Sequence, residues 1–446
     1  MKFRLSVSVT TVFLASLLAQ SATGAENAAP SAPSQARRAL ARQILANRDL
    51  DEVAGLGQQM FRDRLNAGSH YAEVWIRDFE TFIETALEVR KPEEIRDALL
   101  VFFHFQGDGG DIVDGYAPKE KALKRYRLRW SATKPEFAAH KNTVEVDQEP
   151  ALVSATWKYA QITGDASLLQ MSVNGQTVLQ RLERALDYLL ENRFDSKHGL
   201  IWAATRIDWT DLQPEHLWGV ELDEASHPSL SIYDNAMFVL AVDRFLDLAG
   251  PRHPTREKWR GVRDSISAKA MQWLWDPARN KFRPHVYLEK GSPFPADFEE
   301  DRIYILGGTV KAIEAGMLTP DRVRSSYRDM VNSRRFAGAA TIGLINYPPY
   351  PAGFFNDPSV QPHIYVNCTD WTWWGGRVVQ MLAAQGMVDE AYRELLPIVQ
   401  RVKQEQTFRE WHTPENQPQG STHFLGAAGV TTRAIRMIQQ WAKQNQ

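Results

Sequence analysis

Apolar residues at helical spacing run through most of this chain, and several such segments end at a single glycine. In residues 75–90 and 231–249 they recur every three or four positions, as in an amphipathic helix. Ten further segments share the pattern: 36–65, 92–106, 146–163, 168–193, 255–276, 303–316, 320–333, 370–385, 387–405 and 425–443. The punctuating glycines are Gly164, Gly250, Gly316 and Gly386. A helix, a short turn and a second helix make an antiparallel αα-hairpin, so about a dozen helices predict roughly six hairpins.

Six hairpins with few strand patterns predict an all-α fold, an (α/α)6 toroid with long inter-helix loops, and 36–446 as one domain. The best strand candidates are only 200–205 and 282–288. A stacked solenoid is the competing arrangement, but the sequence shows no repeat of fixed period. Loops this long inside a compact domain tend to be functional. They span 107–145, 197–230, 278–302, 334–369 and 406–424.

The N-terminus has the features of an export signal. Lys2 and Arg4 precede an apolar run over 7–18, and small residues follow at 22–24. We therefore expect a signal peptide over 1–24 and a periplasmic or secreted protein. The apolar run is shorter than the roughly 20 residues that span a bilayer, so no membrane insertion is expected. Residues 25–35 are rich in Ala, Pro and Ser, which predicts a disordered leader.

Composition excludes several classes of protein. Cys368 is the only cysteine, so no intramolecular disulfide is possible, and the chain is long enough to bury a large core without one. Lys and Arg number 52 against 54 Asp and Glu with no basic stripe, which argues against nucleic acid as a partner. The histidines show no metal-ligand spacing, and we expect no metal and no cofactor. The oligomeric state is not encoded in any pattern we recognise.

Two segments carry carboxylates beside tryptophan. Asp208, Trp209 and Asp211 follow a short strand pattern, and burial against an aromatic face raises a carboxyl pKa, as a general acid requires. The alternative is that these aspartates cap a turn. Glu410 precedes Trp411 between two helices and has the chemistry to activate water; the alternative is a loop glutamate paired with Arg409.

Asp211 and Glu410 are 199 residues apart, so only the fold can pair them. In an inverting glycosidase the two carboxyl groups stand roughly 6.5–9.5 Å apart across the scissile bond. A toroid brings such loops together because alternate inter-helix loops gather at the same end.

Two helix starts are further candidates for sugar contact. Arg77 and Asp78 follow Trp75, which suits recognition of sugar hydroxyls beside a flat wall; a helix-terminal salt bridge is the equal alternative. Asp370 is expected to cap a helix N-terminus, and three tryptophans follow it: Trp371, Trp373 and Trp374. Core packing would explain one or two of these tryptophans, whereas three so close together predict the wall of a pocket. The Gly- and Asp-rich segment 107–115 lacks calcium-loop spacing and predicts a mobile rim loop.

In order along the chain, these motifs resemble the (α/α)6 six-hairpin glycosidases. That group includes the processing α-glucosidases of glycoside hydrolase family 63 and the glycogen-debranching α-1,6-glucosidase domain. Trp75-Ile76-Arg77-Asp78 is similar to the family's W-x-R-D, which contacts the sugar in the −1 subsite. Trp209-Thr210-Asp211 resembles its W-x-D, whose Asp is the general acid. Glu410-Trp411-His412-Thr413-Pro414 with Gly420 resembles its E-N-Y-x-P…G, whose Glu is the general base.

The resemblance extends to three further segments: Val146-Asp147, Tyr233-Asp234-Asn235-Ala236 and Trp374-Gly375-Gly376. It implies inverting hydrolysis of an α-linked glucoside or related oligosaccharide without a cofactor, by Asp211 and Glu410. The substrate-binding residues it implies are Trp75, Arg77, Asp78, Asp147, Trp209, Asp208, Asn235, Trp374, Trp411 and His412.

The chain departs from the family pattern at three places. Gly375 replaces an Arg, Trp411-His412 replaces Asn-Tyr, and Asp208 competes with Asp211 as the acid. Two other functions stay open. One is a polysaccharide lyase or sugar epimerase on the same toroid, for which His412 and Tyr233 are proton-transfer candidates. The other is a glycan-binding protein without catalysis.

Overall fold

The computed structural model describes residues 34–124, 127–217 and 219–446. The predicted signal peptide 1–24 lies outside the described residues, as does the predicted leader up to residue 33. The last two residues of the predicted leader, Ser34 and Gln35, are described, and they are ordered at the start of a helix. Ser34 caps the first helix, α1 (Gln35–Ala46), because its hydroxyl accepts a hydrogen bond from the Arg37 amide at 3.3 Å.

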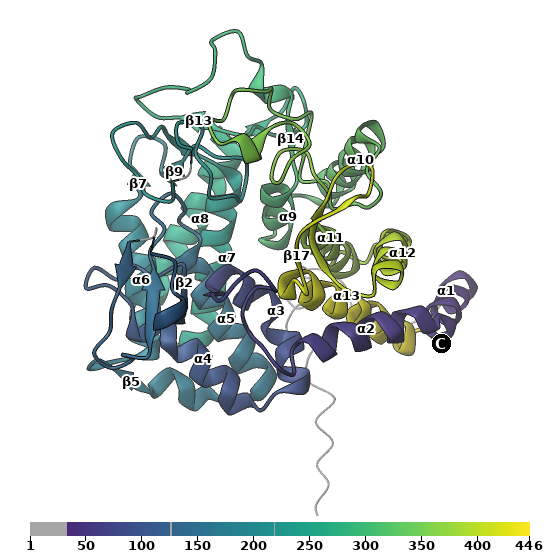
Figure 1. Ribbon diagram of the computed structural model, residues 1–446, viewed down its shortest axis with the longest axis horizontal. Coiled ribbons are helices and arrows are strands. Elements are labelled where there is room, and N and C mark those ends of the chain that lie inside the picture. The colour runs from purple at the N-terminus through teal and green to yellow at the C-terminus, as the bar shows by residue number, and fades with distance from the viewer. Residues whose placement is uncertain (1–33, 125–126, 218) are drawn as a thin grey trace, which may run out of the picture.

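Six helices form a closed inner ring, and six others alternate with them along the chain (Figure 1). The inner helices are α3 (Ile76–Val89), α5 (Gln148–Thr163), α7 (Ile232–Ala249), α9 (Gly307–Glu314), α11 (Thr372–Ala384) and α13 (Leu425–Gln444). Each packs on the next, and α13 packs against α3 to close the ring. The outer helices are α2 (Arg48–Met60), α4 (Pro92–His104), α6 (Val178–Asn192), α8 (Arg256–Trp273), α10 (Pro320–Ala337) and α12 (Val388–Glu405). The fold is the predicted (α/α)6 toroid.

The apolar pattern of each helix explains its layer. Every residue of α7 from Ile232 to Val242 is buried, and its two polar members, Asp234 and Asn235, have hydrogen-bond partners. The outer helix α8 buries only Trp259, Ile266 and Ala270 on one face. The core therefore lies between the two rings and inside the inner one.

The four glycines act as the sequence predicts. Backbone φ is +70° at Gly164, +77° at Gly250, +67° at Gly316 and +76° at Gly386. Residues with a side chain rarely adopt this left-handed conformation, so glycine ends each helix and starts the return.

Three helix predictions need correction. The segment 36–65 breaks at Asn47, whose extended backbone and side chain cap α2 by accepting from the Asp49 amide at 3.1 Å. The segment 168–193 is α-helical only from Val178 and starts in a short 3-10 helix, η2 (Ala166–Gln170). Between the two helices, Asn174 and Gly175 both have positive φ and form a tight hairpin, which Asn-Gly pairs favour. The segment 303–316 begins with a short strand and is helical only in α9.

All paired strands are short and antiparallel. A four-stranded sheet has the order β1-β2-β4-β3, and a three-stranded sheet the order β13-β10-β9. Their strands are β1 (Val74–Trp75), β2 (Gly115–Pro118), β3 (Leu128–Arg129), β4 (Phe137–His140), β9 (Ala203–Ala204), β10 (Pro228–Leu230) and β13 (Val286–Tyr287). The two-stranded pairs are β5 (Ser172–Val173) with β6 (Gln176–Thr177), β7 (Phe194–Asp195) with β8 (Leu200–Ile201), β11 (Trp275–Asp276) with β12 (Lys281–Phe282), β14 (Tyr304–Ile305) with β15 (Asn346–Tyr347) and β16 (Arg409–His412) with β17 (Pro418–Thr422). Apart from β5 and β6, all lie in connections from an outer helix to the next inner helix.

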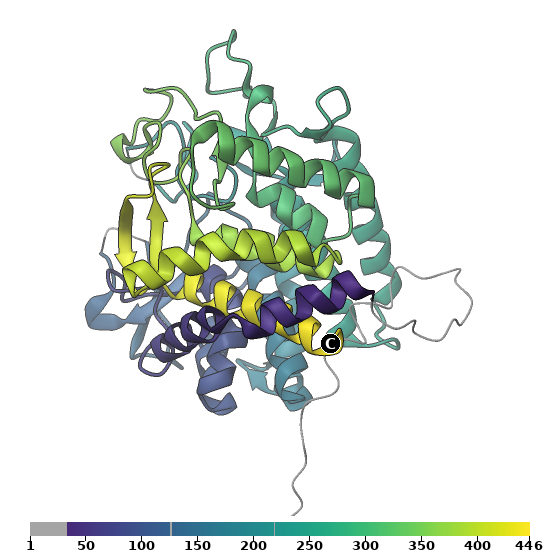
Figure 2. The same cartoon turned by 90° about the vertical axis from the view of Figure 1, so that its right-hand side faces the viewer.

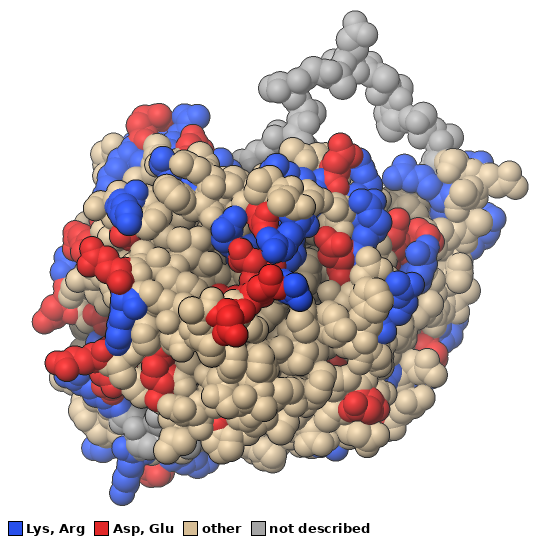
Figure 3. All heavy atoms as spheres, turned by 90° about the horizontal axis from the view of Figure 1, so that it is seen from above, with Lys and Arg blue, Asp and Glu red and all other residues tan. Residues whose placement is uncertain are grey.

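The two ends of the described chain lie together. Helices α1 and α2 pack against α13, and Figure 2 shows these purple helices beside the yellow C-terminal one. On the face drawn in Figure 3, basic side chains are interspersed with acidic ones. Within the described ranges, no helix combines the length and the apolar character needed to cross a membrane.

Candidate active site

A cavity of about 290 Å³ lies where the outer-to-inner connections meet, over the N-terminal ends of the inner helices. Five of the six connections and the first turns of α3 and α11 line it. The lining residues are Ala67, Tyr71, Trp75, Arg77, Asp78, Asp114, Trp209, Thr210, Asp211, Leu212, Asp357, Ser359, Tyr365, Val366, Trp371, Trp373, Glu410 and Phe424. Four of the five long loops singled out in the sequence contribute to this wall.

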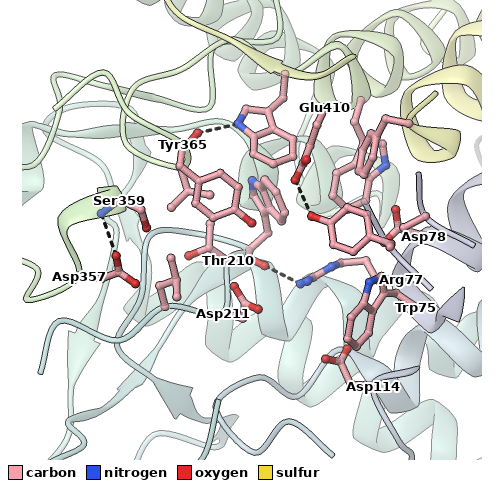
Figure 4. A pocket seen from close by; sticks show the side chains of 18 residues that line it. Trp75, Arg77, Asp78, Asp114, Thr210, Asp211, Asp357, Ser359, Tyr365 and Glu410 are labelled. Atoms are coloured by element: carbon pink, nitrogen blue, oxygen red, sulfur yellow. Dashed lines mark hydrogen bonds between the residues drawn. The ribbon is translucent and has the colours of Figure 1, made fainter. Parts of the chain in front are cut away.

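Asp211 and Glu410 both face this cavity, from the α6–α7 and α12–α13 connections. Figure 4 shows their carboxyl groups pointing into the same space from different sides. The toroid therefore brings together two side chains that are far apart in the sequence.

Two donors hold the Glu410 carboxylate. The Tyr71 hydroxyl donates to Oε1 at 2.9 Å and the Ser421 amide donates to Oε2 at 2.8 Å. Gly420 permits this approach, because a Cβ there would meet Glu410 Oε2 at 2.6 Å and φ is +67°. Burial raises the pKa of Glu410, while both hydrogen bonds oppose the rise by favouring the ionised form. Glu410 is thus a fixed carboxylate that faces the cavity.

Asp211 has a different environment. It is half-buried, and within the described chain no other residue donates a hydrogen bond to its carboxylate. Burial raises the pKa of Asp211, and the Arg77 guanidinium only partly offsets that rise. A raised pKa favours the protonated form of a carboxyl group, which is the form that a general acid needs.

Asp208, the rival acid, is bound elsewhere. Its two oxygens accept the amides of Gly307 at 2.6 Å and Gly308 at 2.9 Å, at the start of α9. A Cβ on Gly307 would meet Asp208 Oδ2 at 2.7 Å, so glycine is required for this contact. Asp208 does not line the cavity; it anchors the α6–α7 connection to the ring.

Arg77 combines the two roles considered in the sequence. It lines the cavity, yet its Nη1 donates to the Trp209 carbonyl at 2.7 Å and also contacts Asp147 at 3.2 Å and Glu145. Asp147 lies behind the wall, where it also accepts the Tyr233 hydroxyl at 2.9 Å. The predicted substrate contact by Asp147 is therefore replaced by a role in holding Arg77.

Several buried polar atoms of the lining residues have no hydrogen-bond partner among the described residues. They are Arg77 Nε, Asp78 Oδ1, Trp209 Nε1 and Thr210 Oγ1. Burial raises the pKa of Asp78 to about 7. These four atoms have almost no accessible surface, so they lie behind the wall of the cavity and not at its surface.

Aromatic rings cluster behind these groups. The Trp209 ring lies edge-on to Trp371 at 5.0 Å and to Trp373 at 4.9 Å between centroids. Both partners line the cavity and Trp374 does not, so two of the three predicted wall residues reach the cavity. The expected Asp370 N-cap is wrong: its carboxylate accepts from the Thr341 amide at 2.8 Å and from Arg401 at 2.6 Å.

Three further predicted contacts lie outside the cavity lining. Asn235 bonds the backbone of Ile201 through both side-chain atoms, at 2.9 and 3.0 Å, and so fixes β8. His412 is fully buried and pairs with Glu405 at 2.8 Å. Trp411 packs 6.3 Å from the Tyr365 ring centroid.

The sequence reasoning missed four polar lining residues besides Asp114: Tyr71, Asp357, Ser359 and Tyr365. Asp114 had a signal, since it ends the Asp-rich segment assigned to the rim. The others sit in connections without a motif, and only their spatial neighbours give them a role. Among the described residues, no group of three His, Cys, Asp or Glu side chains is placed to hold a metal ion.

Known structures share this fold. An uncharacterized conserved protein from Thermus thermophilus matches with a TM-score of 0.61 and 15% identity, over 86% of this chain and 98% of that one. The glycoside hydrolase family 63 mannosylglycerate hydrolase of the same organism, in complex with Tris and D-glycerate, matches with a TM-score of 0.60 and 14% identity, over 86% and 99%. A rhamnosidase from Klebsiella oxytoca with rhamnose bound matches with a TM-score of 0.55 and 14% identity, over 89% and 64%.

These likenesses confirm the predicted resemblance to six-hairpin glycosidases at the level of the fold. No family model matches the sequence, and no curated protein matches it.

Proposed function

We propose that the protein is an inverting glycoside hydrolase that acts on an α-linked glucoside or a related oligosaccharide outside the cytoplasm. The observation that carries this proposal is the pair of carboxyl groups in one cavity. Asp211 accepts no hydrogen bond from another described residue, whereas Glu410 is held by Tyr71 and Ser421. Different environments for two carboxyl groups are the usual basis for separate acid and base roles.

In this mechanism Asp211 gives its proton to the glycosidic oxygen as the bond to the anomeric carbon breaks. Glu410 takes a proton from a water molecule, whose oxygen bonds to the anomeric carbon from the opposite face. The products are a sugar of inverted configuration and a free alcohol. Arg77, Asp78 and Trp75 form the wall that receives the sugar.

The size of the cavity supports exo-action. About 290 Å³ is at the lower end of the range for small-molecule sites, roughly 300–1,000 Å³, which favours a terminal sugar over the interior of a polymer. The lyase or epimerase alternative has less support, because neither His412 nor Tyr233 lines the cavity. Export rests on the N-terminal sequence, and cell fractionation of the full-length protein tests it.

The central test is a screen of the mature protein against α-linked disaccharides and α-aryl glycosides, with NMR of the first product. Asp211→Asn and Glu410→Gln each remove nearly all turnover while circular dichroism stays native. Glu415→Gln is the matched control, because Glu415 is exposed in the same connection as Glu410. Full activity in both active-site variants, or retention of configuration, contradicts the proposal. Binding of glycans without any release identifies a non-catalytic protein.

A further inference from the structure

The titratable side chains of the described part of the cavity wall are mostly acidic. Its ionisable acidic and basic side chains are five carboxyl groups, Asp78, Asp114, Asp211, Asp357 and Glu410, and one cation, Arg77. That cation is already paired with Glu145 and Asp147 and bonded to the Trp209 carbonyl. The described residues of the wall therefore offer no unpaired basic side chain to an anionic ligand.

Asp357 differs from the other four carboxyl groups in its position. Figure 4 shows Asp357 and Ser359 on the far side of Asp211 from Trp75 and Asp78. Ser359 is exposed at the mouth, whereas Asp357 is 8% exposed. Because Asp211 protonates the oxygen between the two halves of a substrate, the side opposite Asp78 receives the leaving group.

Contacts between two connections fix this arrangement. The Asn356 amide donates to the Pro214 carbonyl at 2.9 Å, and the Asn356 side chain donates to the Glu215 carbonyl at 2.7 Å. These bonds tie the residue before Asp357 to the segment that follows Asp211. These two bonds fix the position of Asp357 relative to the proposed acid, Asp211.

The Asp357 carboxylate has one bond to spare. Its Oδ1 accepts the Ser359 amide at 2.8 Å, and no basic side chain of the described residues forms an ion pair with it. Its other oxygen is not among the buried atoms that lack a partner, so it stays accessible, and a ligand in the cavity can supply it with a donor. A hydroxyl or an ammonium group does so, and a carboxylate or phosphate does not.

We propose that Asp357 and Ser359 form the leaving-group subsite, and that Asp357 selects neutral or amino-bearing polyhydroxy leaving groups over anionic ones. This inference rests on the proposed function, since it takes Asp211 as the acid. It adds the chemical class of the second half of the substrate.

Three α-D-glucosides test it, linked through the secondary hydroxyl of glycerol, of glycerate or of 3-aminopropane-1,2-diol. Their leaving groups are of one size and carry charges of 0, −1 and +1. Two like charges about 6 Å apart at an effective dielectric constant of about 40 predict about tenfold lower kcat/KM for the glycerate compound than for the neutral one. The amino compound is equal to or better than the neutral one.

Asp357→Asn keeps the size and the acceptor for the Ser359 amide but removes the charge, so the ratio between neutral and anionic substrates falls toward one. Glu415→Gln is the control and leaves the ratio unchanged. Equal kcat/KM for the three compounds, a preference for the glycerate glucoside, or an unaltered ratio in Asp357→Asn overturns the inference.

Calorimetric binding of the same three compounds to Glu410→Gln separates this inference from the proposed function. If Glu410→Gln binds the neutral and amino compounds more tightly than the glycerate compound, and the double variant Glu410→Gln with Asp357→Asn does not, the subsite is supported. That result stands even where the wild-type protein shows no turnover, and the absence of turnover then refutes only the hydrolase. Binding without a charge order, or no binding of any of the three, refutes the subsite.

Discussion

The hydrogen bond from Tyr71 to Glu410 makes a measurable prediction about the pH dependence of activity. Tyr71→Phe removes the hydroxyl that donates to Glu410 Oε1 at 2.9 Å and leaves the ring in place. A hydrogen bond to a charged group contributes about 1.5–3 kcal/mol, and about 1.36 kcal/mol corresponds to one pH unit. The Ser421 amide remains and takes up part of the loss, so we expect the Glu410 pKa to rise by about one unit.

The sign follows from the role of the residue. The Tyr71 donor stabilises the ionised carboxylate and lowers the pKa of Glu410, so its removal raises that pKa. A general base works only when ionised, and the acidic limb of the kcat/KM profile therefore moves to higher pH by about one unit. Well above that limb, kcat/KM returns toward the wild-type value.

The assay is kcat/KM between pH 4 and 9 with any glycoside that the screen identifies. Tyr116→Phe is the matched control, because its buried hydroxyl donates to the Ala98 carbonyl outside the cavity. That variant loses stability without a shift of the limb. An acidic limb that stays in place or moves to lower pH in Tyr71→Phe refutes the assignment of Glu410 as the base.

Four other outcomes follow from the same contacts. Asp208→Ala removes two charge-assisted bonds to the start of α9 and lowers the unfolding free energy, measured by denaturant titration, by about 2–4 kcal/mol. The unfolding free energy of Asp208→Asn lies between those of Asp208→Ala and the wild type. Gly420→Ala strains a residue at φ +67° and pushes on Glu410, so kcat falls by at least about tenfold and the melting temperature drops; unchanged kcat contradicts the contact. The folded-state pKa of Asp78, about 7, lies above its unfolded value, so stability falls as pH rises from about 4 to 7. Asp78→Asn is therefore more stable than wild type at pH 8 by up to about 4 kcal/mol. Paired melting curves show this advantage at pH 8 and none at pH 4. Since Asp211 must carry a proton and its pKa is raised, the alkaline limb of kcat/KM lies above the ordinary Asp range, and a profile still rising at pH 9 excludes it as the acid.

Much of the fold was predictable, because its main signals are local. Glycines with positive φ mark the hairpin turns, and apolar spacing marks the helices. The pairing of Asp211 with Glu410 also followed, since a toroid has only two ends. The Asn174-Gly175 hairpin was missed although its signal is local: the dipeptide that favours such a turn was present within a pattern assigned to one helix.

The polar details of the site were not predictable for a different reason. Asp208 and Asp211 lie in the same short segment, and only the approach of Gly307 and Gly308 determines which one faces the cavity. Asp357 reaches the site because Asn356 bonds a different connection. Such contacts between distant loops leave no trace in the spacing of residues along the chain.

The packing of α13 on α2, α3 and α11 has a consequence for how the molecule acquires its structure. Helix α13, with 20 residues, is the last helix of the chain and closes the inner ring. While the chain is still emerging from a ribosome or a translocation channel, the apolar faces of these three earlier helices are therefore exposed. Contacts of such long sequence separation form late. Deleting α13 therefore exposes apolar surface on α2 and α3, which lie near the N-terminus, as well as on α11.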